Sequence, residues 1–548
     1  MRFSPRRAWL LLLTCGLAGF GVRSPAPALE AAAERPRLVL ALSVDQMRFD
    51  YLTRFAPLYT GGLKTLRERG AVFRNARFRH ACTETGPGHS VFLSGRSPKH
   101  SGIVGNDWYD SVSRRIMNVV DDPVHAAVGG RGRSASPRNF IGFTLGDVLK
   151  RHSPRSRVVG VAGKDRSAIL MGGHRADAAY WYGTGGAMVT STYYMPEPPA
   201  WLTAFNERKL PDGYATRKWT RLLADEAVYL KYAGPDDVKG EWDSEDTVFP
   251  HAIRGRPPED LYYDDLRRTP FADEIVLAAA LAAISAHGLG ADDDTDLLAV
   301  GLSATDSIGH TYGPDSQELM DQLLRVDRAL QQLFDELDRR VGLSRVLVAL
   351  SADHGVLPLV EVLQARGVAA RRAGPDELRK PVEAALQARF PGATGLVATW
   401  DGPNVYLDLD ALGRQRRHRA EVEKAVIDGL MESGLVDRVY THADLLGEPP
   451  ADDPEFPLFR NAFFQPRSAH LVTRLKPYVY VSSYLGGTTH GTVHDYDRHV
   501  PVVFMGAGVP PGTYDAESGP EDVAPTLGAL LGLDYPEQDG RTLREILP

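Results

Sequence analysis

Short apolar runs that end in polar residues give the chain its most regular pattern. Four clear examples are Arg37–Val44, Arg157–Ala162, Leu297–Leu302 and Arg345–Leu350. An unbroken apolar run of this length is typical of a β-strand that is buried on both faces. Amphipathic stretches with helical spacing lie between the runs, at Thr144–Lys150, Pro270–Ser285 and Ser316–Arg340. This alternation of strand and helix predicts an α/β fold, a doubly wound, mostly parallel sheet flanked by helices.

Each of the four runs leads into residues that can do chemistry. Asp45 follows the first run, Lys164 and Arg166 the second, Asp306 the third, and Asp353 with His354 the fourth. The carboxyl ends of parallel strands meet at one edge of the sheet, and ligands of such folds bind there. We therefore expect these side chains to share one site.

Two segments read as inserted subdomains within a catalytic domain over residues 29–548. Residues 171–290 are rich in aromatic residues and proline, and residues 356–489 resemble a small α+β unit. The second segment carries predicted strands at Val405–Leu409 and Tyr478–Val481. Beyond it, Val502–Met505 reads as a further strand, and Asp522 as the cap of a helix that starts there.

The N-terminus has the three regions of a signal peptide. Arginines at 2, 6 and 7 precede the apolar run Ala8–Phe20, and Ala26-Pro27-Ala28 is a plausible cleavage site. The run is short for a membrane span, so we predict a signal peptide over residues 1–28, with an uncleaved anchor as the alternative. The paired arginines hint at twin-arginine export, and Cys15 lacks the preceding small residue of a lipoprotein signal. The protein is therefore expected to be exported, periplasmic or extracellular.

Charge and cysteine content limit the classes of function. The 548 residues carry a net charge of −7, and loss of residues 1–28, with four arginines and no acid, makes it −11. A general nucleic-acid binder needs a basic surface, so this class is excluded, and any phosphate site must be locally positive. Cys82 is the one cysteine beyond the signal, which rules out a disulfide within the mature chain. No second apolar stretch is long enough to span a bilayer. The oligomeric state stays open, with a monomer favoured.

Six residues have the chemistry of metal ligands: Asp45, Asp306, His310, Asp353, His354 and His490. Zinc takes histidine nitrogen and carboxylate oxygen, and six ligands are too many for one tetrahedral ion but suit two. Two neighbouring ions can stabilise both the attacking and the leaving oxygen of a phosphoryl displacement. Taken singly, each such residue is more often a cap or a turn residue, and His494 and His499 are expected not to be ligands.

The block Thr83–Gly95, followed by His100–Asn106, carries a resemblance to a known family. It looks like the nucleophile segment of the alkaline phosphatase superfamily, in the Thr-x-x-Pro-x-His form of the threonine branch. The resemblance implies that Thr85 is the metal-bound nucleophile and forms a phosphothreonine intermediate, and that the Asn106 amide binds a phosphate oxygen. It also implies two Zn²⁺ ions, one held by Asp45, Thr85, Asp353 and His354, the other by Asp306, His310 and His490.

The segment Gly163-Lys-Asp-Arg166 resembles the Lys-x-Arg pair of the PafA-like, phosphate-irrepressible alkaline phosphatases. A phosphate monoester presents a doubly charged face, which extra cationic donors such as Lys164 and Arg166 would meet. Diesterases of the branch often show Phe-Pro-Asn-His after the threonine, where this chain has Gly86-Pro-Gly-His89. A sulfatase would need a Cys/Ser-x-Pro-x-Arg site, which the chain lacks.

The signal peptide predicts export, and the resemblance predicts a metal-dependent hydrolase that acts on small phosphate monoesters and releases inorganic phosphate. A phosphodiesterase or nucleotide pyrophosphatase of the same superfamily is the alternative. From a different class, a metal-stabilised binding protein without catalysis is disfavoured, because nucleophile, ligand set and phosphate clamp are all present.

Overall fold

The computed structural model describes residues 35–242, 246–536 and 538–547. All of these residues belong to one compact unit. The predicted signal peptide, residues 1–28, lies outside the described residues.

A ten-stranded sheet forms the centre of the fold, in the order β20-β2-β19-β12-β1-β11-β6-β7-β8-β5. In that order the strands are Gly512–Ser518, Ala71–Ala76, Val502–Met505, Val346–Ser351, Leu38–Val44, Asp296–Leu302, Val158–Ala162, Ala178–Tyr182, Met188–Ser191 and Ala127–Val128. The five strands from β12 to β7 run parallel to one another. Strands β19 and β8 join this parallel centre in the antiparallel direction. The predicted mostly parallel α/β sheet is confirmed.

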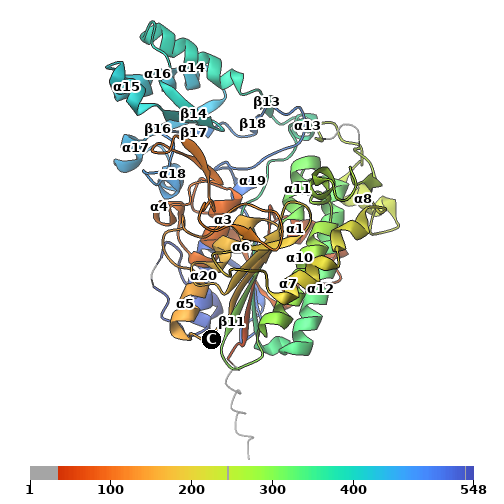
Figure 1. Ribbon diagram of the computed structural model, residues 1–548. Coiled ribbons are helices and arrows are strands. Elements are labelled where there is room, and N and C mark those ends of the chain that lie inside the picture. Colours follow the sequence, from red (N-terminus) through yellow and green to blue (C-terminus); the bar gives the residue numbers. More distant parts are fainter. Residues whose placement is uncertain (1–34, 243–245, 537, 548) are drawn as a thin grey trace, which may run out of the picture. The chain divides into compact units, whose positions relative to one another are not determined.

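Both faces of β1 are buried, which explains its unbroken apolar sequence. Leu38, Leu40 and Leu42 face one core cluster, to which helices α10 (Phe271–His287) and α12 (Gln317–Arg340) contribute. Val39 and Ala41 face another, with residues of α3 (Thr85–Ser94), α5 (Leu145–His152) and α20 (Val523–Leu530). Figure 1 shows α10 and α12 on one side of β11, and α5 and α20 on the other. Helices on both faces leave the carboxyl edge of the parallel strands as the open place for a site.

Two local predictions need correction. Leu409 is not the end of a strand, because β15 (Asn404–Leu407) stops earlier and Asp408 caps helix α15 (Leu409–Arg414) by accepting from the Ala411 amide. The side chain of Asp522 does not cap α20. Its carboxylate accepts hydrogen bonds from the Arg79 guanidinium instead, at 2.7 Å. The same carboxylate accepts from the Gly519 amide at 3.0 Å, so locally it caps the 3-10 turn Pro520–Asp522 that precedes α20 and not α20 itself.

The beginning of the first expected insertion lies in the central sheet. The aromatic run near Tyr180 forms β7, which pairs in parallel with β6. This strand is buried on both faces but consists largely of aromatic residues. Its sequence therefore shows neither the polar/apolar alternation of a half-buried strand nor the aliphatic run typical of a buried one. The boundaries of this insertion remain a prediction.

The second expected insertion contains a sheet of its own. Its four strands follow the order β14-β15-β17-β16 and cover Val397–Asp401, Asn404–Leu407, Leu471–Leu475 and Val436–Thr441. Helices α14 (Asp376–Arg389) and α16 (Arg419–Glu432) cover it and contribute to a separate apolar core (Figure 1). This four-stranded sheet, with its helices, is called the small sheet unit below.

No single helix among the described residues is long and apolar enough to cross a bilayer. In the described part of the chain, one bent pair of helices, α9 (Asp260–Leu266) and α10, which meet at 86°, passes that test jointly by length and composition.

Candidate active site

The strand ends of the central sheet position most of the expected site. Asp45 directly follows β1, and Asp353 follows β12, its neighbour in the sheet. After β11 the chain enters helix α11 (Ala304–Tyr312), where Asp306 and His310 are one turn apart and share a face. After β6, Lys164 is the N-cap residue of α6 (Asp165–Gly172). The sheet edge therefore brings together residues that are up to about 300 positions apart in sequence.

Thr85 is the first residue of helix α3, and all ten residues of this helix are buried. The helix tolerates Pro87 because the amides of a first turn have no partner within the helix. Oriented amides at a helix start favour negative charge, so an anion beside Thr85 is stabilised.

Gly88 allows α3 to lie directly against the loop that carries Asp353. A Cβ atom at position 88 would lie 2.1 Å from the Asp353 carbonyl oxygen and 2.5 Å from its Cα. Such distances are impossible for a side chain, so the backbones would have to separate. The glycine at position 88 is thus explained by close packing of two site segments.

The first expected ligand group is compact and fully buried. Asp45, Asp353 and His354 can each direct one ligand atom to a common point, with these atoms within 4.8 Å of one another. His354 Nε2 lies 3.6 Å from Asp45 Oδ1 and 3.4 Å from Asp353 Oδ2. Thr85 Oγ1 lies 3.5 Å from the same nitrogen. The structure therefore brings together all four residues expected in this group.

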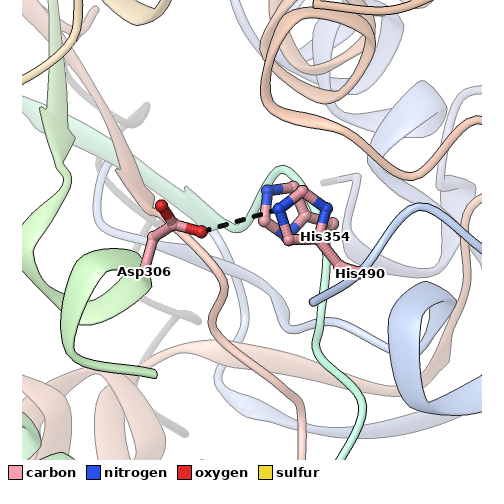
Figure 2. A group of neighbouring side chains, drawn as sticks. All are labelled: Asp306, His354 and His490. Atoms are coloured by element: carbon pink, nitrogen blue, oxygen red, sulfur yellow. Dashed lines mark ion pairs between the residues drawn. The ribbon is translucent and has the colours of Figure 1, made fainter. Parts of the chain in front are cut away.

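The second expected group lies beside the first. His310 Nε2 is 3.2 Å and His490 Nε2 is 3.7 Å from Asp306 Oδ1. Figure 2 shows the Asp306 carboxylate facing the rings of His354 and His490, which stack with centroids 3.5 Å apart. Asp306, His354 and His490 also meet the distance condition for a shared ion. His354 thus lies between the two groups, and the geometry allows it to be a metal ligand in either one.

The hydrogen bonds of the three histidines suit metal binding. Nδ1 of His310, His354 and His490 contacts the backbone carbonyl of Thr488, Gly355 and Thr83, at 2.7, 2.9 and 2.8 Å respectively. This contact holds the proton on Nδ1 and leaves Nε2 free as a ligand, the usual arrangement at metal sites.

The protonation states of the buried histidines and carboxylates also fit a bound cation. Burial lowers the pKa of His354, and it lowers that of His490 strongly, where the neighbouring His354 and His310 add to the effect. Both imidazoles are therefore neutral near pH 7, as ligands must be. Asp45 Oδ1 is buried and accepts no hydrogen bond from the described residues. Buried carboxylate oxygens of this kind require a cation or a proton.

Lys164 lies between the two groups and next to the expected nucleophile. Its Nζ is 2.7 Å from Asp45 Oδ2 and 2.7 Å from Asp306 Oδ2. It donates to Thr85 Oγ1 over 3.3 Å. Burial opposes the charge, but Asp306 and Asp45 outweigh it and raise the pKa of Lys164. The ammonium therefore stays charged in this buried place.

Arg166 reaches the same oxygen with most of its hydrogen-bonding capacity unused. Its Nη2 lies 3.5 Å from Thr85 Oγ1, and its one ion pair among the described residues is a 3.9 Å contact with Asp165. Nε is buried and has no partner there. A guanidinium in this condition is suited to bind an anion placed at Thr85.

Asn106 is oriented by two hydrogen bonds. Its Oδ1 accepts from the Gly86 amide at 2.8 Å, and its own backbone amide donates to Glu84 Oε2 at 2.8 Å. With Oδ1 engaged, the NH₂ group is the end available to a ligand beside Thr85. Burial and the nearby Asp401 raise the pKa of Glu84 to about 7.

Two residues of the site were not anticipated from sequence. Gln46 donates from its backbone amide to Asp353 Oδ1 at 3.0 Å and from Nε2 to Asp306 Oδ1 at 2.8 Å, so it ties the two groups together. His89 Nδ1 lies 2.9 Å from the Thr85 carbonyl oxygen and 3.2 Å from Asp353 Oδ2. The position of Gln46 directly after Asp45, and that of His89 within the nucleophile block, were the available signals.

His494 and His499 have other partners. His494 Nε2 lies 3.1 Å from the Leu475 carbonyl oxygen, and His499 Nε2 lies 2.8 Å from that of Arg74. Neither belongs to a group of described residues that could share an ion.

Comparison with known proteins gives a consistent result. Residues 39–497 match the family model for type I phosphodiesterase / nucleotide pyrophosphatase. The alkaline phosphatase PafA of Elizabethkingia meningoseptica is 33% identical over 99% of both chains. The alkaline phosphatase PhoV of Synechococcus elongatus is 32% identical over 94% of this chain and 93% of its own.

The solved structures agree with these matches. The crystal structure of wild-type PafA superposes with a TM-score of 0.88 at 33% identity, over 94% of this chain and 100% of PafA. The chain therefore belongs to the type I phosphodiesterase / nucleotide pyrophosphatase family of the alkaline phosphatase superfamily, and it is a hydrolase that acts on phosphate esters.

Proposed function

We propose that the protein is an alkaline phosphatase that hydrolyses small phosphate monoesters and releases inorganic phosphate. The observation that carries the proposal is the pair of cations at the nucleophile, Lys164 Nζ at 3.3 Å and Arg166 Nη2 at 3.5 Å from Thr85 Oγ1. Two cationic donors match the dianionic face of a monoester better than the single charge of a diester. The relatives named alkaline phosphatases support the same reaction.

Thr85 is the proposed nucleophile. Its hydroxyl gives up its proton to solvent, Oγ attacks phosphorus, the bond to the ester oxygen breaks, and the alcohol departs with a proton from solvent. Water then attacks the phosphothreonine and releases inorganic phosphate. Lys164, Arg166 and the Asn106 amide bind the non-bridging oxygens, where negative charge must be stabilised during both displacements.

Two Zn²⁺ ions are the proposed cofactors, with Asp45, Thr85, Asp353 and His354 as one ligand set and Asp306, His310 and His490 as the other. The donor set of carboxylate oxygens and neutral imidazoles fits zinc. Bound zinc would lower the pKa of the threonine hydroxyl and stabilise the leaving oxygen. The contact between the His354 and His490 rings, with centroids 3.5 Å apart, supports two neighbouring sets that act on one phosphoryl group.

Removal of metal is expected to abolish activity and to lower the melting temperature. Buried carboxylates such as Asp45 and Asp353 repel each other without a cation, which destabilises the fold as well as the site. Activity and thermal unfolding should be measured after dialysis against a chelator, and again after addition of Zn²⁺, Mg²⁺ or Ca²⁺. Zinc should restore both readouts. Full activity in a preparation free of metal by elemental analysis would contradict the proposal.

Activity is expected to be low below about pH 6 and to rise to an alkaline plateau, since a monoester loses its second proton near pH 6. Asp306 outweighs burial and raises the pKa of His310, so a ligand proton must be lost on metal binding, which also favours higher pH. The measurement is kcat/KM against pH, and an optimum below about pH 6 would point to an acid phosphatase mechanism.

Asp306 and Asp45 raise the pKa of Lys164 above 10.5. The contribution of this shift to the free energy of unfolding is complete below pH 10.5 and is lost as the pH rises through the raised pKa of Lys164 in the folded state.

A diesterase or nucleotide pyrophosphatase is the second candidate, favoured by the family model that matches residues 39–497. Hydrolysis of p-nitrophenyl phosphate beside bis-p-nitrophenyl phosphate, with and without chelator, separates the two. A monoesterase should prefer the first substrate, and a preference for the second would reverse the assignment.

Export is part of the proposal, on the grounds of the signal-like residues 1–28. The enzyme would then act in the periplasm or outside the cell, as a monomer, on esters that do not enter the cytoplasm.

A further inference from the structure

A cavity of about 380 Å³ opens beside the candidate active site, between the nucleophile loop and the small sheet unit. Glu84, the neighbour of Thr85, and His490 of the second ligand group form its wall on the site side. The opposite wall comes from β14, β15, β17, helix α18 (Phe456–Ala462) and β18 (Val479–Val481). This volume is in the range of small-molecule sites in proteins. The cavity is called the leaving-group cavity below.

Aromatic and aliphatic side chains make up much of the far wall. Tyr406, Phe459, Phe463 and Tyr480 line it, and each is at most 7% exposed. The Tyr406 hydroxyl donates to the Arg467 carbonyl at 2.9 Å, so its ring is held in place. Rigid rings around a space of this size suit the flat or apolar body of an organic molecule.

The charge in the leaving-group cavity is negative and unpaired. Glu84 and Asp401 line it, and no ion pair among the described residues involves either. Burial raises the pKa of both, to about 6 for Asp401 and about 7 for Glu84, so both carboxylates are charged in the alkaline range. Arg474 is the one guanidinium among its lining residues in the described chain. Arg474 already forms ion pairs with Asp437, Asp453 and Glu455, at 2.6, 2.8 and 3.0 Å.

Asp401 is placed at the cavity by a hairpin. It ends β14 and pairs with Asn404 at the start of β15, and Gly402 in the turn between them has a φ of 53°. A two-residue turn of this kind fixes the direction in which the strand ends point. The hairpin therefore fixes the position of the Asp401 backbone in the cavity wall.

The position of the cavity relates it to the ester group of a substrate. In an in-line displacement the leaving oxygen departs on the side opposite the nucleophile. In two-ion sites, one ion stabilises the attacking oxygen and the other stabilises the leaving oxygen. Thr85 is close to the first ligand group, whereas His490, of the second, forms part of the cavity wall.

We propose that the leaving-group cavity binds the alcohol part of the substrate and favours an alcohol with an apolar or aromatic body and a cationic end. This rests on the proposed function and adds to it the class of substrate. The body packs against the rings around Tyr406, and the cation is held by the carboxylates of Asp401 and Glu84. An alcohol that carries a second negative charge is disfavoured by the same two carboxylates.

Three benzyl phosphates with matched leaving groups test the proposal. 4-(Aminomethyl)benzyl, 4-methylbenzyl and 4-carboxybenzyl phosphate differ in charge far from the reacting bond, so their intrinsic reactivities are similar. We expect kcat/KM to fall in that order, with about tenfold or more between the first and the last, the scale of one charge-assisted contact. Equal values, or a preference for the carboxylate, would overturn the proposal.

Asp401→Asn is the decisive variant, because it removes the charge and keeps the shape. The preference for the aminomethyl over the methyl compound should drop several-fold. Asp410→Asn is the matched control: this carboxylate also lies in the small sheet unit, is 73% exposed and pairs with Arg114 at 2.7 Å. The control should keep the wild-type preference, and an unchanged preference in Asp401→Asn would refute a role for the cavity.

Methyl phosphate separates this proposal from the proposed function, since it has no body that reaches the cavity. If methyl phosphate and the benzyl esters all fail to react, the monoesterase assignment falls. Calorimetric titration of 4-(aminomethyl)benzyl alcohol then tests the cavity alone. Binding that is weakened by Asp401→Asn supports it, and equal or absent binding in the wild type and the variant overturns it.

Discussion

Thr85→Ala should lose at least about three powers of ten in turnover, the scale for removal of a catalytic nucleophile when its surroundings remain. The hydroxyl lies at the start of α3, within 3.5 Å of His354, Lys164 and Arg166. No other hydroxyl of the described nucleophile block has this set of neighbours. Steady-state kcat for a phosphate monoester is the measurement.

Thr83→Ala is the matched control, two residues away on the same loop. The Thr83 hydroxyl donates to the Thr492 carbonyl at 2.7 Å. Its loss should lower stability by about 0.5–1.5 kcal/mol and leave most of the turnover. Acid trapping during turnover should place covalent phosphate on Thr85. Phosphate on Thr83 or Ser90, or equal losses in both variants, would show that a different residue is the nucleophile.

Replacement of both Lys164 and Arg166 by alanine should reduce monoester turnover far more than diester turnover. Each charge-assisted contact is worth about 1.5–3 kcal/mol, so two contacts correspond to a shift of about two to four powers of ten in preference. Diester hydrolysis should survive, because Thr85 and the ligand groups are retained. The measurement is kcat/KM for one matched monoester and diester pair.

Lys164 also contacts Asp45 and Asp306, each at 2.7 Å, so its removal could alter metal content. Zinc per chain should therefore be determined in the double variant and should equal that of the wild type. Lys150→Ala with Arg151→Ala is the control, since it removes the same charge from the end of α5, outside the site. Equal losses on both substrates would mean that the pair supports structure or metal and does not select the substrate.

The proximity of the expected ligands at one edge of the sheet was predictable because these residues follow strand ends. Asp45, Asp306 and Asp353 each follow an apolar run, and the parallel sheet brings these ends to one edge. Such runs are local patterns, and a parallel sheet has only one carboxyl edge. His490 follows no such run; its residue type made it a candidate ligand, but only the family resemblance assigned it to a ligand set. The structure places its Nε2 3.7 Å from Asp306.

Other elements depended on contacts that sequence patterns do not encode. The aromatic run near Tyr180 was read as part of an insertion and is β7, because its pairing with β6 decides its place. Gln46 looked like an ordinary residue after a strand, yet it bonds to both Asp353 and Asp306. Its role depends on the distance between two strand ends, which is a property of the folded sheet.

By itself, the sequence determined the α/β class, the edge of the sheet at which the site lies, and the residue types gathered there. Strand burial and strand ends are short-range patterns, set by a few consecutive residues. Only the tertiary structure decided that Gly88 must be glycine, how His354 stands between two ligand groups, and that Asp401 borders a cavity beside Thr85. Those features join segments up to about 300 residues apart, and packing between distant segments follows from the whole fold rather than from any local pattern.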